Sequence, residues 1–293
     1  MGYMLAFLSA LCYSITNIVL KKGMSHSQYN GVWIITLINV IVLGHVLALA
    51  VIFGSLPNLN RTGVILFAVA GFLINVVGRS LLYSSIRING SSKAVAIKNS
   101  APAFTVLFAV VVLHEQITLW PWVGISLIMV GLLLLGVRFF QEGAKVAQRS
   151  GYWLALAAAV AYGLGQGLTK QAMEYMYEPI LGVFLGCLTA FLFLSVIEAG
   201  KGNIRSFIRA NFQKINKYYV CAGVLTSLAL LLFYLSVSYI LVSYSVAILA
   251  IDPVLTVILS KFFLKKEEKV SFLILIVAVL VFIGATIVSL MGS

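Results

Sequence analysis

The sequence predicts an all-α integral membrane protein, in which ten transmembrane helices form two inverted five-helix repeats. Three observations support this prediction. Of the 293 residues, 62% are hydrophobic and only 10% are charged, whereas soluble domains are about half apolar and about a quarter charged. Apolar runs of the length that a bilayer requires recur along the whole chain. The two halves of the chain also match each other in sequence.

Each apolar run is predicted to be a helix, because a segment in lipid must pair its own backbone groups and barrel strands use shorter, alternating segments. The connections between the runs are short and contain turn residues such as Asn89-Gly90-Ser91. In chain order, the predicted helices cover residues 2–20, 32–54, 63–86, 92–113, 119–138, 152–173, 179–198, 218–240, 243–264 and 270–290.

The repeat is seen in residues that recur at a nearly constant offset of about 150 positions. The matched pairs include Tyr13 with Tyr162, Asn17 with Gln166, and Pro102 with Pro253. Because each half contains an odd number of helices, a duplicated unit inserts upside down relative to its twin. We therefore predict repeats at residues 1–143 and 150–293 within one membrane domain, with a substrate site near the midplane where the repeats meet.

The net charge of +12 is better explained by membrane orientation than by nucleic-acid binding, because the basic residues lie in the connections. Of the 20 Lys and Arg residues, 16 lie in or beside the connections after the odd-numbered helices: Lys21, Lys22, Arg87, Lys93, Arg138, Lys145, Arg149, Lys201, Arg205, Arg209, Lys214, Lys217, Lys261, Lys265, Lys266 and Lys269. This bias predicts a multi-pass protein of the cell (plasma or inner) membrane. Both termini are expected to be extracytoplasmic, and the basic loop 200–217 cytoplasmic.

The duplicated unit, a central proline in residues 91–118 and in residues 242–271, and the glutamates that follow (Glu115, and Glu267 or Glu268) resemble the ten-helix EamA-type branch of the drug/metabolite transporter superfamily. The resemblance implies transport of a small solute, with amino acids, sugars, nucleotide sugars, drugs and organic ions among the family's substrates. Two features depart from it. Family members usually keep both termini in the cytoplasm, and the small multidrug branch has an essential acid in its first helix, which is absent here.

Two cations are predicted to lie within the membrane. Arg79 lies 11 residues before the turn at Gly90 and Lys98 lies 8 residues after it, so they are about 16 and 12 Å from that face. Both are therefore near mid-depth on adjacent antiparallel helices and can point into one cavity. A charge at the bilayer centre costs roughly 2.5–3.5 kcal/mol on insertion scales, so each one requires an explanation.

The other polar residues extend this candidate site. Asn75, Arg79 and Tyr83 recur every four residues and form one stripe, whereas Asn99 is expected to point about 100° away from Lys98. Asp252 also lies near mid-depth. One interpretation is a cationic pocket for an anionic or zwitterionic substrate, with a two-pronged arginine contact. The other is an internal ion pair of Asp252 with Lys98 or Arg79 that holds the halves together.

Prolines and aromatic residues complete the candidate site. Pro102 and Pro253 occupy matching places and are predicted hinges, since matched interruptions of transport helices mark binding sites; static kinks are the alternative. Tyr13, Asn17, Tyr162 and Gln166 are predicted to line the cavity, with packing as the alternative.

We therefore predict a secondary transporter that works by alternating access on a small anionic or zwitterionic metabolite, such as an amino acid, organic acid or sugar phosphate. An exporter of amphipathic drugs or cations is one alternative, and a membrane-embedded enzyme on lipid-linked substrates or an accessory membrane protein is another. No catalytic residue, cofactor or metal site is predicted, because the histidines are dispersed and no metal or phosphate-loop motif occurs. The expected partners are the lipid bilayer and a small-molecule substrate, with protons as a candidate coupling ion and Asp252 as their candidate site. Nucleic acid is not expected, and the chain is predicted to be a monomer or a homodimer.

Overall fold

The computed structural model describes residues 1–25, 31–54, 57–141, 146–202, 208–209, 216–263 and 272–291. Within these residues the chain is helical and forms no strand. Most of the loop 200–217 lies outside the described residues. The following residues named above also lie outside them: Lys145, Arg205, Lys214, Lys265, Lys266, Lys269, Glu267 and Glu268.

Long apolar helices make up most of the molecule. Five helical stretches in the described part are long and apolar enough to cross a membrane: α1 (Gly2–Ser25), α2 (Val32–Phe53), the stretch Arg61–Asn89, α9 (Pro179–Gly200) and α11 (Lys217–Tyr239). The other long helices are α7 (Leu119–Gln141), α8 (Val146–Tyr175) and α14 (Phe272–Met291). These helices make the chain a multi-pass membrane protein.

Two of the predicted helices are interrupted in the structure. The run 92–113 is divided into α5 (Ser91–Lys98) and α6 (Ala101–Val111), and the run 243–264 into α12 (Val242–Leu249) and α13 (Asp252–Phe263). The sequence predicted a bend at each proline, whereas the helix already ends four residues before it, at Lys98 and at Leu249. Each proline then lies in the first turn of the next helix, where its missing N–H removes no helical bond.

The stretch Arg61–Asn89 contains a wider turn that the sequence did not predict. It consists of α3 (Arg61–Gly71), the π-helix η1 (Phe72–Gly78) and α4 (Arg79–Asn89). At the end of α3, a Cβ added to Gly71 would lie 2.1 Å from the Cα of Gly186 in α9, so the two backbones touch there. π-Turns inside α-helices occur often at functional sites, and this one ends directly before Arg79.

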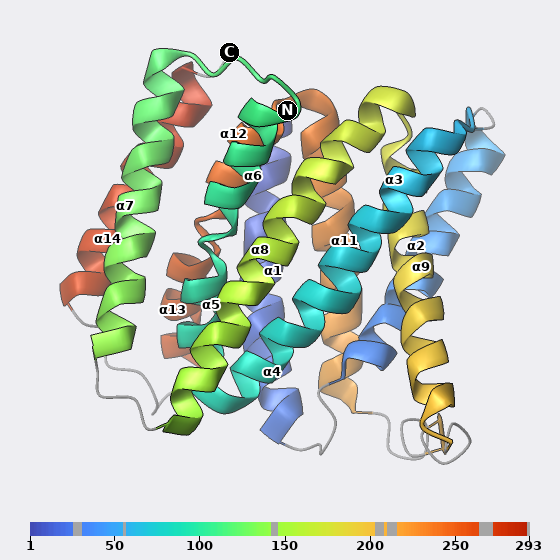
Figure 1. Cartoon of the computed structure of the whole chain (residues 1–293), viewed down its shortest axis with the longest axis horizontal. Helices are drawn as coiled ribbons and strands as arrows, with labels where there is room; N and C mark the ends of the chain where they lie inside the picture. The colour runs from blue at the N-terminus through green and yellow to red at the C-terminus, as the bar shows by residue number, and fades with distance from the viewer. Residues whose placement is uncertain are drawn as a thin grey trace.

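The first helix of each half packs mainly against helices of the other half. α1 lies along α11 and also contacts α12 and α13, whereas α8 packs on α3, α4, α5 and α6. α7 and α14 form a pair at one edge of the bundle, where Gly124 and Gly284 bring their backbones together. The markers of both chain ends lie at the same end of the molecule, and the break between α5 and α6 is near its middle (Figure 1).

Candidate functional site

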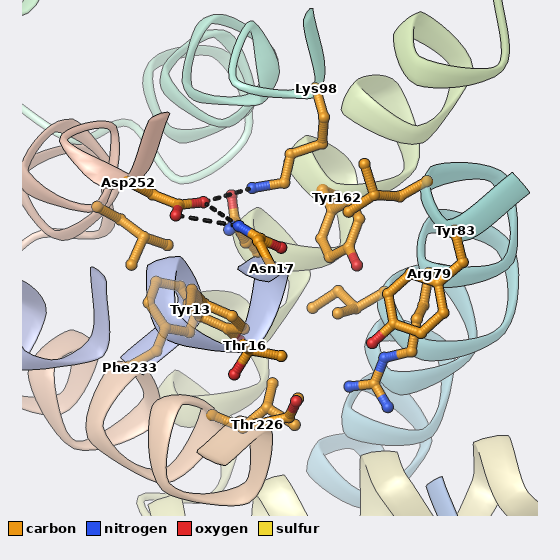
Figure 2. A pocket seen from close by; sticks show the side chains of 15 residues that line it. Tyr13, Thr16, Asn17, Arg79, Tyr83, Lys98, Tyr162, Thr226, Phe233 and Asp252 are labelled. Atoms are coloured by element: carbon orange, nitrogen blue, oxygen red, sulfur yellow. Dashed lines mark hydrogen bonds and ion pairs between the residues drawn. The ribbon is translucent and has the colours of Figure 1, made fainter. Parts of the chain in front are cut away.

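A pocket lies where α1, α4, α5, α8, α11 and α13 meet, beside both helix breaks. The empty space among its side chains is about 590 Å³, counting the part open to solvent. The 15 residues that line it are Tyr13, Thr16, Asn17, Ile74, Arg79, Leu82, Tyr83, Lys98, Tyr162, Gln166, Thr226, Leu230, Phe233, Leu249 and Asp252. Figure 2 shows the two charged centres of the pocket on opposite sides, Lys98 with Asp252 on one and Arg79 on the other.

Asp252 begins α13 and is 2% exposed. Its Oδ1 atom accepts hydrogen bonds from Ser14 Oγ at 2.8 Å, Thr256 Oγ1 at 3.0 Å and Asn17 Nδ2 at 3.1 Å. Its Oδ2 atom has fewer partners, the same Asn17 nitrogen at 3.3 Å and Lys98 Nζ at 4.0 Å. Three neutral donors therefore fix the position of the carboxyl group, and Oδ2 faces the ammonium group of Lys98.

Lys98 is the last residue of α5, and its side chain reaches into the pocket. Its Nζ atom donates to Asn99 Oδ1 at 2.8 Å and lies 5.2 Å from the ring centre of Tyr162, which is a cation–π distance. The prediction that Asn99 points away from Lys98 was wrong, because α5 ends at Lys98 and Asn99 has left the helical conformation. Of the two ion pairs considered for Asp252, the structure contains the one with Lys98.

Arg79 is buried at 2% exposure and contacts neutral groups. Its terminal nitrogens donate to Asn75 Oδ1 at 2.6 Å and Thr36 Oγ1 at 3.3 Å. With the Asn39 amide turned so that its own contacts are satisfied, the Asn39 oxygen accepts from both nitrogens at 2.9 and 3.3 Å. Within the described residues, no carboxylate lies at ion-pair distance from Arg79. In this conformation, the Arg79 nitrogens that were expected to bind a substrate carboxylate or phosphate bind neutral side chains instead. The positive charge of Arg79 therefore has no negative charge beside it among the described residues.

The predicted site residues come together around this pocket with few exceptions. Tyr13, Asn17, Arg79, Tyr83, Lys98, Tyr162, Gln166 and Asp252 all line it. Asn75 is not among the residues that line the pocket, but its Oδ1 atom accepts a hydrogen bond from Arg79. Pro102 lines a smaller neighbouring pocket of about 210 Å³, which also contains Lys98 and Gln166. The side chain of Pro253 lies outside what the structure describes.

Sequence reasoning missed the small polar residues that hold the charged ones. Ser14 and Thr256 bind Asp252, and Thr36 binds Arg79. Such residues occur throughout membrane helices, where their hydroxyls also bond to their own backbone, as Ser14 does to the Ala10 carbonyl at 2.8 Å. The available signal was spacing, since Ser14 lies one helical turn before Asn17 and Thr256 one turn after Asp252.

The charged residues lining the pocket give it a formal charge of +1. Arg79 and Lys98 are the cations and Asp252 is the acid. Because burial in low dielectric strengthens electrostatic interactions, this surplus acts on any ion inside the pocket more strongly than the same charge would in water. Tyrosine hydroxyls at Tyr13, Tyr83 and Tyr162 supply further polar contacts, and Phe233 and leucines supply apolar walls.

Comparison with known proteins places these features in a family. A transporter of Clostridium kluyveri of undetermined function is 27% identical over 212 residues, which cover 67% of this chain and 65% of the relative. An uncharacterized protein of Methanocaldococcus jannaschii is 31% identical over 74 residues, 25% of this chain and 54% of the relative. The aligned part thus spans less than two thirds of either relative. A protein of known crystal structure shares the fold, with a TM-score of 0.69 over 99% of this chain and 97% of that one, at 17% identity. The model of the EamA-like transporter family matches residues 1–137 and 149–290, so this chain belongs to the EamA-like transporter family, within the drug/metabolite transporter superfamily.

Proposed function

We propose that the protein is a secondary transporter for a small organic anion, built from ten membrane helices in two inverted repeats, and that the anion binds in the pocket between Arg79 and Lys98. The observation that carries this proposal is the charge of Arg79, which is buried among neutral partners and has no acid beside it in the described structure. A buried cation is costly unless something compensates it. An anionic substrate in the pocket supplies that compensation.

The helix breaks support transport by alternating access around this pocket. α5 ends and α6 begins beside it, and α12 ends and α13 begins on its other side. Interrupted helices at matching places in two halves are typical of transporters whose halves rock around a central site. The family model also matches each half of the chain over a similar length, residues 1–137 and 149–290.

The roles of the two cations differ in this proposal. The guanidinium of Arg79 is held in place by neutral side chains, so it acts as a fixed charge in the wall. Two charges roughly 10 Å apart interact by about 1.7 kcal/mol at an effective dielectric constant of about 20. Removing the charge of Arg79 is therefore expected to weaken anion binding roughly 20-fold.

A matched set of four compounds on one benzene ring tests the proposal. Benzoate is an anion, 4-(aminomethyl)benzoate a zwitterion, benzamide neutral and benzylamine a cation, and the aromatic walls of the pocket suit all four. Binding is measured by thermal shift on the purified protein and transport by counterflow in proteoliposomes. We expect benzoate to bind best, Arg79→Gln to lose about 20-fold in its affinity, and Arg61→Gln, at an exposed arginine at the start of α3, to bind as the wild type does.

Preference for benzylamine would favour the second candidate function, export of amphipathic cations. The observation behind that alternative is the buried Asp252 carboxylate among Tyr13, Tyr162 and Phe233, because aromatic faces and an acid together recognise ammonium groups. In that case Asp252→Asn would abolish binding while Arg79→Gln would strengthen it. Equal binding of all four compounds would reject both functions.

A further inference from the structure

The two oxygens of the Asp252 carboxyl group are not equivalent. Oδ1 accepts from Ser14, Asn17 and Thr256, whereas among the described residues Oδ2 has only the 3.3 Å hydrogen bond from Asn17 and the ammonium of Lys98 at 4.0 Å. A proton bound to Oδ2 would leave the bonds to Oδ1 intact. The carboxyl group would therefore stay in place on protonation, while its attraction for Lys98 would be lost and the 3.3 Å bond from Asn17 to Oδ2 weakened.

We propose that Asp252 carries a proton on Oδ2 during transport and that this proton releases Lys98 to contact the anionic group of the substrate. Proton and anion then bind together, and the protein is a proton–anion symporter. This proposal rests on the proposed function, since it requires an anionic substrate. The proton enters from water on one side of the membrane and leaves to water on the other, and no other bond is formed or broken.

The surroundings of Lys98 allow it to change partners. It is held by one hydrogen bond to Asn99 and by the face of the Tyr162 ring, in addition to the long contact with Asp252. Its side chain lines both the main pocket and the smaller neighbouring pocket, together with Gln166 and Leu249. Release from Asp252 therefore leaves the ammonium group within space that a ligand can occupy.

Few other ionisable groups surround Asp252. α13 packs on α1, α5 and α14. Of these, α5 supplies Lys98 and α1 supplies Tyr13 to the pocket, and the part of α14 that the structure describes contains no ionisable side chain. Tyr162 of α8 lines the same pocket, and Arg79 and Tyr83 line it across from Asp252. Because tyrosines stay neutral near pH 7, the charges that act on the proton equilibrium of Asp252 from this pocket are those of Lys98, Arg79 and the bound substrate.

The sign of the coupling follows from these charges. An anion near Lys98 competes with ionised Asp252 for the ammonium group, so anion binding favours the protonated acid. By reciprocity, protonation of Asp252 strengthens anion binding by the same factor. A zwitterion whose ammonium group bound Asp252 would give the opposite sign, because it would compete with the proton for Oδ2. The pH dependence of affinity therefore distinguishes the two substrate classes.

The proton site is tested first without any ligand, by infrared difference spectra of the purified protein between acidic and neutral solution. We expect the carbonyl band of a protonated buried carboxyl group in the wild type and its loss in Asp252→Asn. In Lys98→Gln the band should persist in less acidic solution, because the ammonium no longer stabilises the carboxylate. Glu198→Gln is the control, since Glu198 is an acid paired with Lys201 at 2.6 Å at an exposed helix end. A band that survives in Asp252→Asn, or that does not move in Lys98→Gln, overturns the proposal.

The coupling is then tested by benzoate binding between neutral and acidic pH, where benzoate remains ionised. Linkage to one proton predicts that the wild-type dissociation constant falls by up to about tenfold per pH unit as the solution is acidified. In Asp252→Asn we expect tight binding that does not depend on pH, because the amide can present N–H groups toward Lys98 as the protonated acid does. Weaker benzoate binding on acidification, or a pH dependence retained in Asp252→Asn, overturns the proposal. If no anion binds, the proposed function and the coupling both fail, whereas the ligand-free spectra still report whether Asp252 is the proton site.

Discussion

Glu115 lies in the loop after α6 and binds the first residues of α12. Replacing it should weaken this contact by a measurable amount. Its carboxylate accepts from the backbone N–H of Val242 at 3.0 Å, from that of Ser243 at 3.4 Å and from Ser243 Oγ at 2.6 Å. The residue that precedes α12, Leu241, has no side-chain acceptor to cap the helix. Glu115 therefore caps a helix of the second half from a loop of the first half.

The cost of replacing Glu115 by glutamine can be worked from these bonds. Glutamine keeps one oxygen acceptor, for Val242 N–H or for the Ser243 hydroxyl, but it loses the second acceptor and the charge. Hydrogen bonds to charged groups contribute about 1.5–3 kcal/mol, and loss of an N-cap costs about 0.5–2 kcal/mol. We expect the free energy that stabilises the start of α12 to fall by about 1–2 kcal/mol. Local opening of the first turn of α12 should then be roughly 5–30-fold more frequent.

Hydrogen exchange measured by mass spectrometry reads this opening directly at the first amides of α12. In Glu115→Gln these amides should exchange roughly 5–30-fold faster. Glu178→Gln is the matched control, because Glu178 accepts from the Asn58 N–H at 3.1 Å in an exposed loop. That variant should speed exchange near Asn58 alone. Unchanged exchange at Val242 and Ser243 in Glu115→Gln would refute the assignment of Glu115 as the cap.

Three further predictions concern stability and orientation. Gly71→Ala should cost about 1–3 kcal/mol, because its Cβ would lie 2.1 Å from Gly186 Cα; Gly44→Ala, whose nearest neighbour is a Phe184 ring atom at 3.3 Å, should cost less, and equal thermal unfolding temperatures would contradict this reasoning. Lys170→Met should lower the thermal unfolding temperature, because Lys170 donates to two carbonyls at the end of α11 at 3.0 and 3.3 Å, and an unchanged temperature would argue against that role. A fluorescent protein fused to the C-terminus should stay dark in bacterial cells, since the charge bias puts that end outside, and a fluorescent cytoplasm would reverse the orientation.

The positions of the helices were predictable because lipid leaves few choices for an apolar backbone. The predicted run 179–198 and the observed Pro179–Gly200 differ little. The break before Ala101 was harder to place, because a proline marks the region of an interruption but not the residue at which the preceding helix ends. The π-turn Phe72–Gly78 was not predictable from hydrophobicity, because its residues are as apolar as those of an ordinary helix.

The charged part of the site was predictable for a different reason. Arg79, Lys98 and Asp252 stand out in apolar runs because their insertion is costly, and all three line one pocket. Their partners depended on three-dimensional detail. Lys98 rather than Arg79 pairs with Asp252 because of where α5 ends. The neutral partners of Arg79 include Thr36 of α2, which no regular spacing along the chain connects to Arg79.

A comparison of the two halves predicts that the charge of Asp252 can be removed without loss of the fold. Thr105 donates to Gln166 at 3.0 Å, and the pair at the matching positions of the two repeats, Asn17 and Thr256, is in contact at 3.5 Å. This polar link between the first helix of one half and the interrupted helix of the other half is therefore made twice. Beside the link between Thr105 and Gln166, the position that corresponds to Asp252 is Ala101. The packing of α6 on α8 thus exists without an acid at that place. It follows that Asp252→Asn, which keeps both the shape of the side chain and an oxygen acceptor for Ser14 and Thr256, removes the ionisable group from a scaffold that does not need it to fold.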